Sequence, residues 1–183
     1  MTVEDFKLHV IGDHETVLSN DRVYRYTLWR QVPPILDFQE ERFKWGTSDY
    51  IQFIGLNPST ADEVQDDPTI RRCRYFAARM GFKWLCMTNL FAFRATDPDD
   101  MKKAEHPIGP ANTNWLEAIA KGAGLVIAAW GVHGRFMNRD MQIRGVISNL
   151  YCLGKTKDGH PRHPLYLKNT AVPIPYDPLA PPI

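Results

Sequence analysis

The chain has 183 residues, of which 44% are hydrophobic and 11% aromatic, and its formal net charge is +1. This composition predicts a single globular domain over residues 1–183, long enough to bury a sizeable core. A net charge so close to zero excludes a strong general attraction to DNA or to a membrane surface. The first residues do not resemble a signal peptide and no segment suits a membrane span, so we expect no membrane partner.

The three cysteines, Cys73, Cys86 and Cys152, lie far apart, and no two form a Cys-x-x-Cys pair. Zinc ribbons and iron–sulfur clusters need such pairs, so the sequence predicts neither a metal nor another cofactor. Unpaired cysteines favour a reducing compartment, and we expect the protein in the cytoplasm.

Residues 1–48 are predicted to form an N-terminal extension that places an antiparallel hairpin at the edge of a sheet. The hairpin strands are expected at 15–18 and 22–30, where β-branched and aromatic residues gather on either side of a polar turn. At the other end of the chain, residues 169–183 are predicted as a proline-rich tail that is irregular from Ala171.

Residues 49–168 are predicted to form the core, in which apolar strands alternate with helices. The stretch 49–60 begins as a buried strand and breaks into a polar loop. Further strands are expected at 84–93, 124–130 and 150–153. Helices are expected at 68–80, at 97–98 onwards, at 113–121 and at 135–149. The alternation predicts an α/β fold, a three-layer α/β/α sandwich around a four-stranded parallel sheet with right-handed crossovers.

Two aspartates, Asp67 and Asp97, each precede a proline at the expected start of a helix. Aspartate is a favoured N-cap and proline suits the first helical position, so both are predicted as caps rather than as catalytic acids. Gly81 is the expected end of the helix that begins at Pro68.

A ligand site is predicted where the parallel strands end, because open α/β sheets bind ligands at the carboxyl ends of their strands. Asn57 follows the first strand, where it either faces a ligand or closes an Asx-turn. Asn89 interrupts an apolar strand and needs partners for its amide, from a ligand or from the backbone. Trp130 either stacks on a base or fills the core.

A loop rich in glycine and proline contains His160 and His163, so neither is expected to be a core histidine. The loop predicts a preorganised hydrogen-bond donor, or two solvated histidines on the surface. The acidic residues Asp62, Glu63, Asp66 and Asp67 leave a divalent cation as a weaker alternative. Several basic residues are candidates for phosphate contacts: Arg71, Arg72, Arg74, Lys155, Lys157, Arg162 and Lys168.

Three short motifs follow one another in order: Gly55-Leu56-Asn57-Pro58, Thr88-Asn89-Leu90 and His163-Pro164-Leu165. They resemble the first motif, the base-reading strand motif and the second catalytic motif of the uracil-DNA glycosylase superfamily, especially its mismatch-specific branch. The stretch from about residue 50 to 168 also resembles an uncharacterised bacterial and phage family, domain of unknown function 1643 (DUF1643). That second resemblance rests on Asn57-Pro58-Ser59-Thr60-Ala61-Asp62, Asp67-Pro68-Thr69-Ile70-Arg71-Arg72-Cys73 and Arg162-His163-Pro164-Leu165-Tyr166-Leu167.

The resemblance to the glycosylases implies a mechanism in which Asn57 and His163 are catalytic. Asn57, with the backbone carbonyl of Pro58, would place a water at C1′ of a nucleoside, a positional effect because an amide is a poor base. His163 would stabilise the negative charge of the departing base, Asn89 would read the base edge, and a base in duplex DNA would first be flipped out. The residues predicted to bind substrate are Gly55, Pro58, Ser59, Asn89, Arg94, Trp130, His160 and Arg162.

Three functions therefore compete. The first is hydrolysis of an N-glycosidic bond in a nucleic acid or a nucleotide. The second is a non-catalytic module that binds a nucleobase, a modified nucleotide or single-stranded or modified DNA. The third and weakest is a phosphohydrolase that uses a metal held by the acidic loop.

Overall fold

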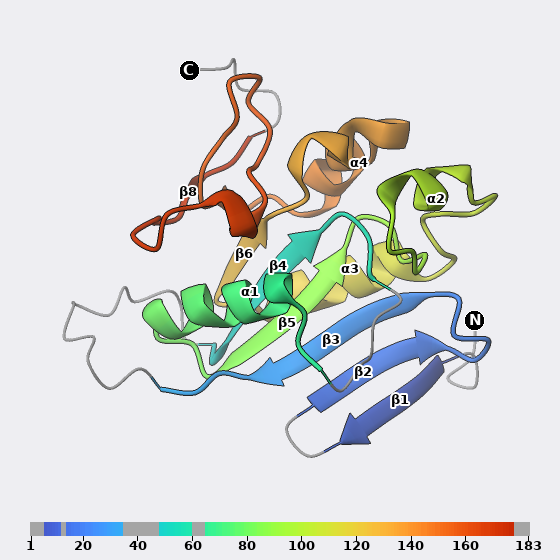
Figure 1. Ribbon diagram of the computed structural model, residues 1–183, viewed down its shortest axis with the longest axis horizontal. Coiled ribbons are helices and arrows are strands. Elements are labelled where there is room, and N and C mark those ends of the chain that lie inside the picture. The colour runs from blue at the N-terminus through green and yellow to red at the C-terminus, as the bar shows by residue number, and fades with distance from the viewer. Residues whose placement is uncertain (1–5, 12–13, 35–47, 60–64, 178–183) are drawn as a thin grey trace.

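The computed structural model describes residues 6–11, 14–34, 48–59 and 65–177 (Figure 1). Its centre is a mixed sheet, in which the described strands run in the order β1-β2-β3-β5-β4-β6-β7-β8. The strands are β1 (Phe6–Ile11), β2 (His14–Ser19), β3 (Arg25–Gln31), β4 (Tyr50–Gly55), β5 (Trp84–Asn89), β6 (Leu125–Ala128), β7 (Leu150–Cys152) and β8 (Ile174–Pro175). The helices are α1 (Pro68–Arg79), α2 (Pro98–Lys103), α3 (Asn112–Gly122) and α4 (Arg139–Val146), with the 3-10 segments η2 (Gly131–Asn138) and η3 (Pro164–Tyr166).

The middle of the sheet contains the parallel strands that the sequence predicts. β4 pairs in parallel with both β5 and β6, and β6 pairs in parallel with β7. The register sets Gly55 at the end of β4 opposite Asn89 at the end of β5. The prediction of an α/β fold with a parallel sheet is therefore confirmed, within a larger sheet that also contains antiparallel strands.

Antiparallel strands extend the sheet at both edges. The predicted hairpin is present as β2 and β3, and β3 pairs with β5 while β1 adds an outer strand. The opposite edge ends in β8, which pairs antiparallel with β7, so the prediction of an irregular tail is wrong at this point. Pro175 is compatible with a strand here because an edge strand needs no ladder donor on its outer side. The buried ring of Tyr176, 5.7 Å from that of Trp130, holds the segment to the core.

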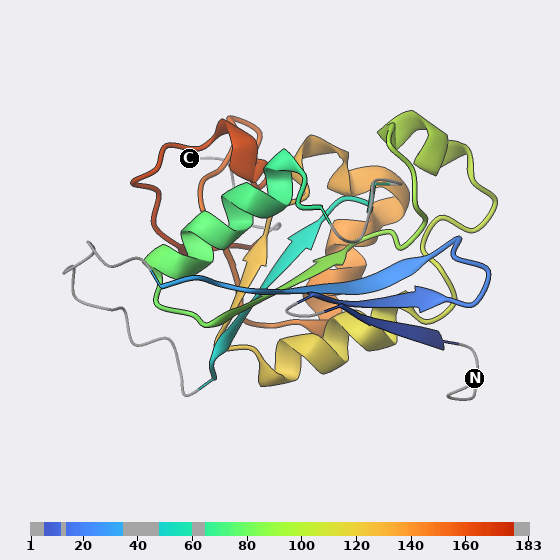
Figure 2. The ribbon, with the colours of Figure 1, turned by 60° about the horizontal axis from the view of Figure 1, so that its bottom comes forward.

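Helices cover both faces of the sheet, with α1 on one face and α3 on the other (Figure 2). On the first face, Ile70 and Phe76 of α1 pack with Phe53 of β4. On the second, Leu116 of α3 packs with Ile54, the next residue along β4. Neighbouring residues of β4 face opposite sides, as in any strand buried on both faces, and this explains its continuous apolar sequence.

The helix boundaries follow the predicted caps, with one exception. Asp67 accepts a hydrogen bond from the Ile70 N–H at 2.8 Å, and Asp97 caps α2 in the same way through Asp99. The predicted helix 135–149 is present only in part, as α4, because η2 and α4 meet at a break where Met137 and Asn138 have φ of 55° and 54°. The break lets Arg139 reach the end of β5, where its Nε donates to the Leu90 carbonyl at 3.0 Å. Within the described residues, every helix is too short or too polar to cross a membrane.

Candidate functional site

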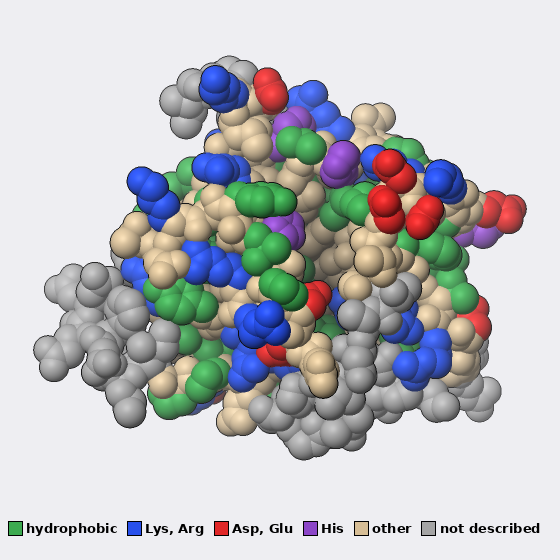
Figure 3. Space-filling view, viewed as in Figure 1, with side chains coloured by type: hydrophobic (Ala, Val, Ile, Leu, Met, Phe, Trp, Pro, Cys, Tyr) green, Lys and Arg blue, Asp and Glu red, His purple; other side chains and the backbone are tan. Residues whose placement is uncertain are grey.

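A pocket of about 700 Å³ opens at the carboxyl ends of the parallel strands β4, β5 and β6. It is also bounded by the start of α1, the residues before α2, and the segment of η3. The residues that line it are Arg25, Gly55, Leu56, Asn57, Ser59, Asp67, Pro68, Thr69, Ile70, Met87, Asn89, Ala95, Thr96, Pro98, Trp130, Gly131, Val132, His133, Thr156, Arg162, His163, Leu165 and Tyr166. On the face of the molecule seen in Figure 3, acidic side chains gather over α2.

The pocket brings together residues that are far apart in the sequence. Asn57, Asn89 and His163 all line it, from the ends of β4 and β5 and from the residue before η3. Four more of the residues predicted to bind substrate also line it: Gly55, Ser59, Trp130 and Arg162. The remaining three, Pro58, Arg94 and His160, are not among the lining residues.

The amide of Asn57 is held in a fixed orientation by the loop that follows β4. Its Nδ2 donates to the Ala95 carbonyl at 2.7 Å and to the Pro58 carbonyl at 3.3 Å. No described residue donates to its Oδ1, so this oxygen is the atom that Asn57 offers to a ligand or a water in the pocket. The alternative of a local Asx-turn does not account for these contacts, because one of the two acceptors lies 38 residues along the chain.

The carbonyl of Pro58 is already engaged. It accepts hydrogen bonds from the Ala95 N–H at 2.9 Å and from the Asn57 side chain. A carbonyl oxygen has two lone pairs, so both are used. The glycosylase resemblance gave this carbonyl a share in holding a water, but in this structure both of its acceptor positions are occupied.

Asn89 and Gly55 lie in close contact at the end of the paired strands. A Cβ on Gly55 would stand 2.7 Å from both Asn89 Oδ1 and Met87 Cε, so the glycine is what allows the amide to lie there. Asn89 is only 2% exposed, and its Nδ2 has no hydrogen-bond partner among the described residues. An unpaired buried amide costs about 1–3 kcal/mol, a cost that an acceptor on a bound ligand would remove.

The imidazole of His163 lies at the start of η3, where its Nδ1 accepts from the Leu165 N–H at 3.4 Å. Burial lowers the pKa of His163 below its usual value, and the nearby Asp67 carboxylate offsets part of this shift. A neutral ring with an acceptor at Nδ1 carries its proton on Nε2. His163 can therefore donate a hydrogen bond into the pocket without being charged.

Arg72 of α1 holds the segment that contains His163, a function that the sequence did not indicate. Its guanidinium donates to the carbonyls of Pro164 and Leu167, at 3.4 Å and 2.5 Å, and to the side chain of Asn169. It also lies 4.6 Å from the ring centroid of Phe76. These contacts give Arg72 a structural role, and its predicted phosphate contact stays a prediction.

Two predicted ligand residues are built into the protein interior instead. Trp130 is 2% exposed and packs so tightly against Gly134 that a Cβ there would overlap its ring, although Trp130 still borders the pocket. His160 is 7% exposed, so the expectation that it would not be a core histidine is wrong, and so is the alternative of a solvated histidine. The backbone N–H of His160 donates to the Thr156 hydroxyl, and the His160 carbonyl accepts from the Thr156 N–H. These two hydrogen bonds close the loop between residues 156 and 160. Arg94 donates instead to the Arg22 carbonyl at 3.1 Å.

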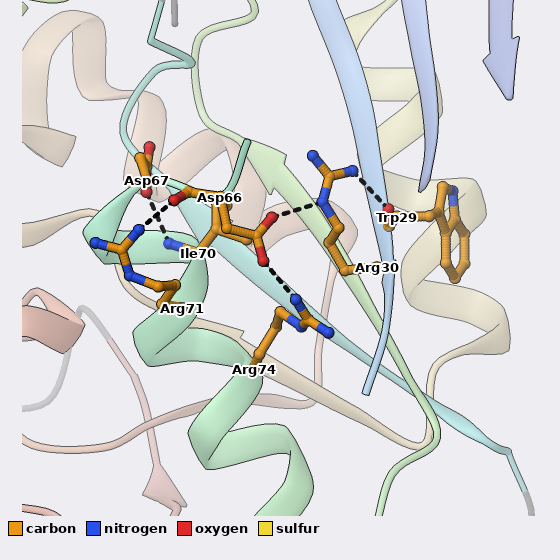
Figure 4. Close-up of polar contacts among 7 residues, drawn as sticks. All are labelled: Trp29, Arg30, Asp66, Asp67, Ile70, Arg71 and Arg74. Atoms are coloured by element: carbon orange, nitrogen blue, oxygen red, sulfur yellow. Dashed lines mark hydrogen bonds and ion pairs between the residues drawn. The ribbon is translucent and has the colours of Figure 1, made fainter. Parts of the chain in front are cut away.

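The acidic loop does not gather its carboxylates around one point. Asp66 lies between two arginines, accepting from Arg30 Nε at 2.7 Å and from Arg74 Nη1 at 2.6 Å (Figure 4). Burial opposes the ionisation of Asp66, but the hydrogen bonds from Arg74 and Arg30 outweigh it and lower the pKa of this carboxyl. Asp62 and Glu63 lie outside the described residues. Within the described part of the chain, no three potential metal ligands lie close enough to share an ion.

The other basic candidates are divided. Arg71 donates to the Asp66 carbonyl at 2.5 Å and Arg74 to the Asp66 side chain, so both serve the loop before α1. Lys155 lies 5.8 Å from the ring centroid of Tyr176. Of the seven basic candidates, only Arg162 lines the pocket.

Some residues that line the pocket were not indicated by the sequence, among them Arg25, His133 and Tyr166. Arg25 is buried within a strand, and only its pairing in the sheet brings it there.

The three cysteines, Cys73, Cys86 and Cys152, are free and buried, and none of them lines the pocket. Burial raises the pKa of each thiol. They act as core residues on the two faces of the sheet.

Comparison with known proteins identifies the family. A model for a protein family of unknown function, DUF1643, matches residues 25–165. This range runs from the start of β3 into η3 and contains all the residues that line the pocket except Tyr166. No curated protein and no solved structure matches the chain. The match covers most of the chain, and the protein belongs to the DUF1643 family.

Proposed function

We propose that the pocket hydrolyses an N-glycosidic bond in a nucleotide or a nucleic acid. The observation that supports this most is the convergence of Asn57, Asn89 and His163 on one pocket at the carboxyl ends of parallel strands. The parallel strands with helices on both faces also agree with a distant relation to the uracil-DNA glycosylase fold. A cavity of this volume suits one nucleoside.

Each of the three side chains suits a separate part of this reaction. Asn57, held by its amide nitrogen, presents Oδ1 as an acceptor for the attacking water. His163 offers a neutral Nε2–H donor to the base as its bond to C1′ breaks and negative charge develops on it. Asn89 has a buried amide nitrogen, Nδ2, that could donate a hydrogen bond to an acceptor on the edge of the base.

The test is base release from single- and double-stranded oligonucleotides and nucleotides that contain uracil, hypoxanthine or other modified bases. Asn57→Ala and His163→Ala are expected to lower the rate by about a hundredfold or more, the usual contribution of a positioned group. Matched controls are Asn114→Ala and His106→Ala, which alter exposed residues outside the pocket. If Asn57→Ala and His163→Ala both release base at the wild-type rate, the catalytic roles assigned to Asn57 and His163 are wrong.

A binding module without turnover is the second candidate, favoured by the engaged carbonyl of Pro58. If the Pro58 carbonyl oxygen cannot hold a water, the hydrogen-bond donors of Asn89 and His163 would serve only to recognise a ligand. This alternative predicts saturable binding of a nucleotide that is weakened by Asn89→Ala, with no base released. Isothermal titration alongside the release assay separates the two candidates.

A further inference from the structure

The pocket contains a carboxylate that the proposed reaction has not used. Asp67 lines the pocket, and among the described lining residues no other aspartate or glutamate occurs. The sequence explains Asp67 as the N-cap of α1, and its Oδ1 does accept from the Ile70 N–H at 2.8 Å. No described residue donates to Oδ2, so the cap leaves one carboxylate oxygen available.

The orientation of Asp67 separates it from the neighbouring acid. In Figure 4 its side chain points away from the guanidinium groups of Arg30 and Arg74, which are both bonded to Asp66. Two adjacent aspartates therefore have different surroundings, one neutralised by arginines and one bordering the pocket. Asp67 and His163 both line the pocket, from the residue before α1 and the residue before η3.

Hydrolysis of an N-glycosidic bond needs a group that the trio of Asn57, Asn89 and His163 lacks. The sugar becomes positively charged as the bond to the base breaks, and the attacking water must lose a proton. An amide provides neither a negative charge nor a base, and a neutral imidazole that donates to the leaving base is already committed. A fixed carboxylate beside the reacting carbon provides both.

Building on the proposed function, we infer that Asp67 is the catalytic carboxylate of this pocket, which stabilises the cationic sugar and accepts the proton of the attacking water. The water oxygen forms its bond to C1′ while the bond from C1′ to the base nitrogen breaks and its electron pair stays on the base. The proton of the water passes to Asp67 Oδ2 and from there to solvent. The negative base is held by the Nε2–H of His163 until solvent protonates it.

The chain offers a close control for the test. Asp67-Pro68 begins α1 and Asp97-Pro98 begins α2, each aspartate capping its helix through Oδ1, but Asp97 does not line the pocket. Asn and Ser cap helices about as well as Asp, so Asp67→Asn and Asp67→Ser remove the charge and keep the helix. Asp97→Asn makes the same chemical change at a residue that does not line the pocket, and thermal unfolding of the full-length variants checks that each remains folded.

Two measurements follow, each on wild type and the three variants. The first is base release from the substrate panel above, which we expect both Asp67 variants to lower by about a hundredfold or more and Asp97→Asn to leave unchanged. The second is binding of an iminoribitol, a pyrrolidine that is protonated at neutral pH and mimics the cationic sugar, with its uncharged tetrahydrofuran analogue for comparison. We expect wild type to prefer the cation by about tenfold or more, and both Asp67 variants to lose this preference.

The outcomes distinguish this inference from the proposed function. If wild type prefers the cation through Asp67 but releases no base, hydrolysis and the catalytic role of Asp67 are both overturned, and Asp67 is left as a residue that binds positive charge. If wild type releases base and the Asp67 variants match it, the inference is overturned while the proposed function stands. If wild type shows neither base release nor preference for the cation, both are overturned.

Discussion

The guanidinium of Arg72 lies 2.5 Å from the carbonyl oxygen of Leu167, so α1 is bonded directly to the segment that follows His163. The same helix begins at the pocket, where Asp67 caps it. Helix α1 thus contacts the pocket in two ways: Asp67 caps its first turn, and Arg72 bonds to the segment that contains His163. The segment that contains His163 is therefore bonded to a side chain that does not line the pocket.

Replacing Arg72 should loosen that segment without unfolding the helix. Arg72→Lys keeps the charge but cannot donate to the acceptors of Pro164, Leu167 and Asn169 in one plane, a loss of about 1–3 kcal/mol. We expect faster amide hydrogen exchange over residues 163–169 and a lower rate of base release. Arg71→Lys, one residue earlier, is the control because Arg71 bonds to the Asp66 carbonyl instead. Equal exchange in the two variants would show that Arg72 does not position His163.

A methyl group at Gly55 should damage the pocket, whereas one at Gly145 should not. Gly55→Ala places a Cβ 2.7 Å from Asn89 Oδ1 and Met87 Cε, so we expect a loss of about 1–3 kcal/mol in the free energy of unfolding and weaker nucleotide binding. Gly145 lies within α4, where an added methyl group would meet no other atom within 4 Å, and Gly145→Ala should raise stability by about 0.5–1 kcal/mol. Urea unfolding and calorimetric titration measure both variants. Opposite signs are expected, and a neutral Gly55→Ala would contradict the close packing.

The ion pair between Arg30 and Asp66 should be strongly coupled to stability. Arg30 is 1% exposed, so Asp66→Ala takes the carboxylate away from a buried guanidinium and should cost about 3–5 kcal/mol. Lys83→Ala, which breaks an exposed pair with Asp49, should cost no more than about 1 kcal/mol. Chemical denaturation at pH 7 compares the free energies of unfolding of the two variants. Similar losses would show that the buried ion pair stabilises the fold no more than the exposed one.

The same carboxylate predicts a loss of stability in acid. The pKa of Asp66 is lower in the folded protein than its unfolded value of about 3.9, so the unfolded chain takes up the proton first as pH falls. Its contribution is fully present above about pH 4 and is lost as the pH falls through the folded pKa. Denaturation between pH 5 and pH 2.5 should show this decline in wild type and a flatter profile in Asp66→Asn.

The two loop histidines predict a second decline at a higher pH. Burial lowers the pKa of both His160 and His163, so the unfolded chain binds protons more readily from about pH 6.5 downwards. Nearby charges modify this: Asp67 acts on His163, while Arg135, Asp140 and Asp158 act on His160. The free energy of unfolding should therefore fall as pH drops through 6.5 and level off below the folded pKa values. His160→Gln with His163→Asn should flatten the profile, and His106→Gln, at an exposed position, should not.

The sequence by itself determined the local structure of this protein. Apolar runs predicted the parallel strands, and Asp67-Pro68 and Asp97-Pro98 predicted the starts of α1 and α2, because strand burial and helix capping depend on neighbouring residues. The order of the strand ends also indicated where a pocket would open. These features need only short-range chemistry.

Tertiary structure alone decided which side chains face the pocket. The break at Met137 accompanies the hydrogen bond from Arg139 to the Leu90 carbonyl, and β8 is followed by Tyr176, which packs against Trp130. These are contacts between segments that no local pattern joins. The burial of His160, the engagement of the Pro58 carbonyl and the bond from Arg72 to Leu167 have the same origin. Hydrogen bonds between residues tens of positions apart form only once the chain has folded, and they choose which polar groups remain for a ligand.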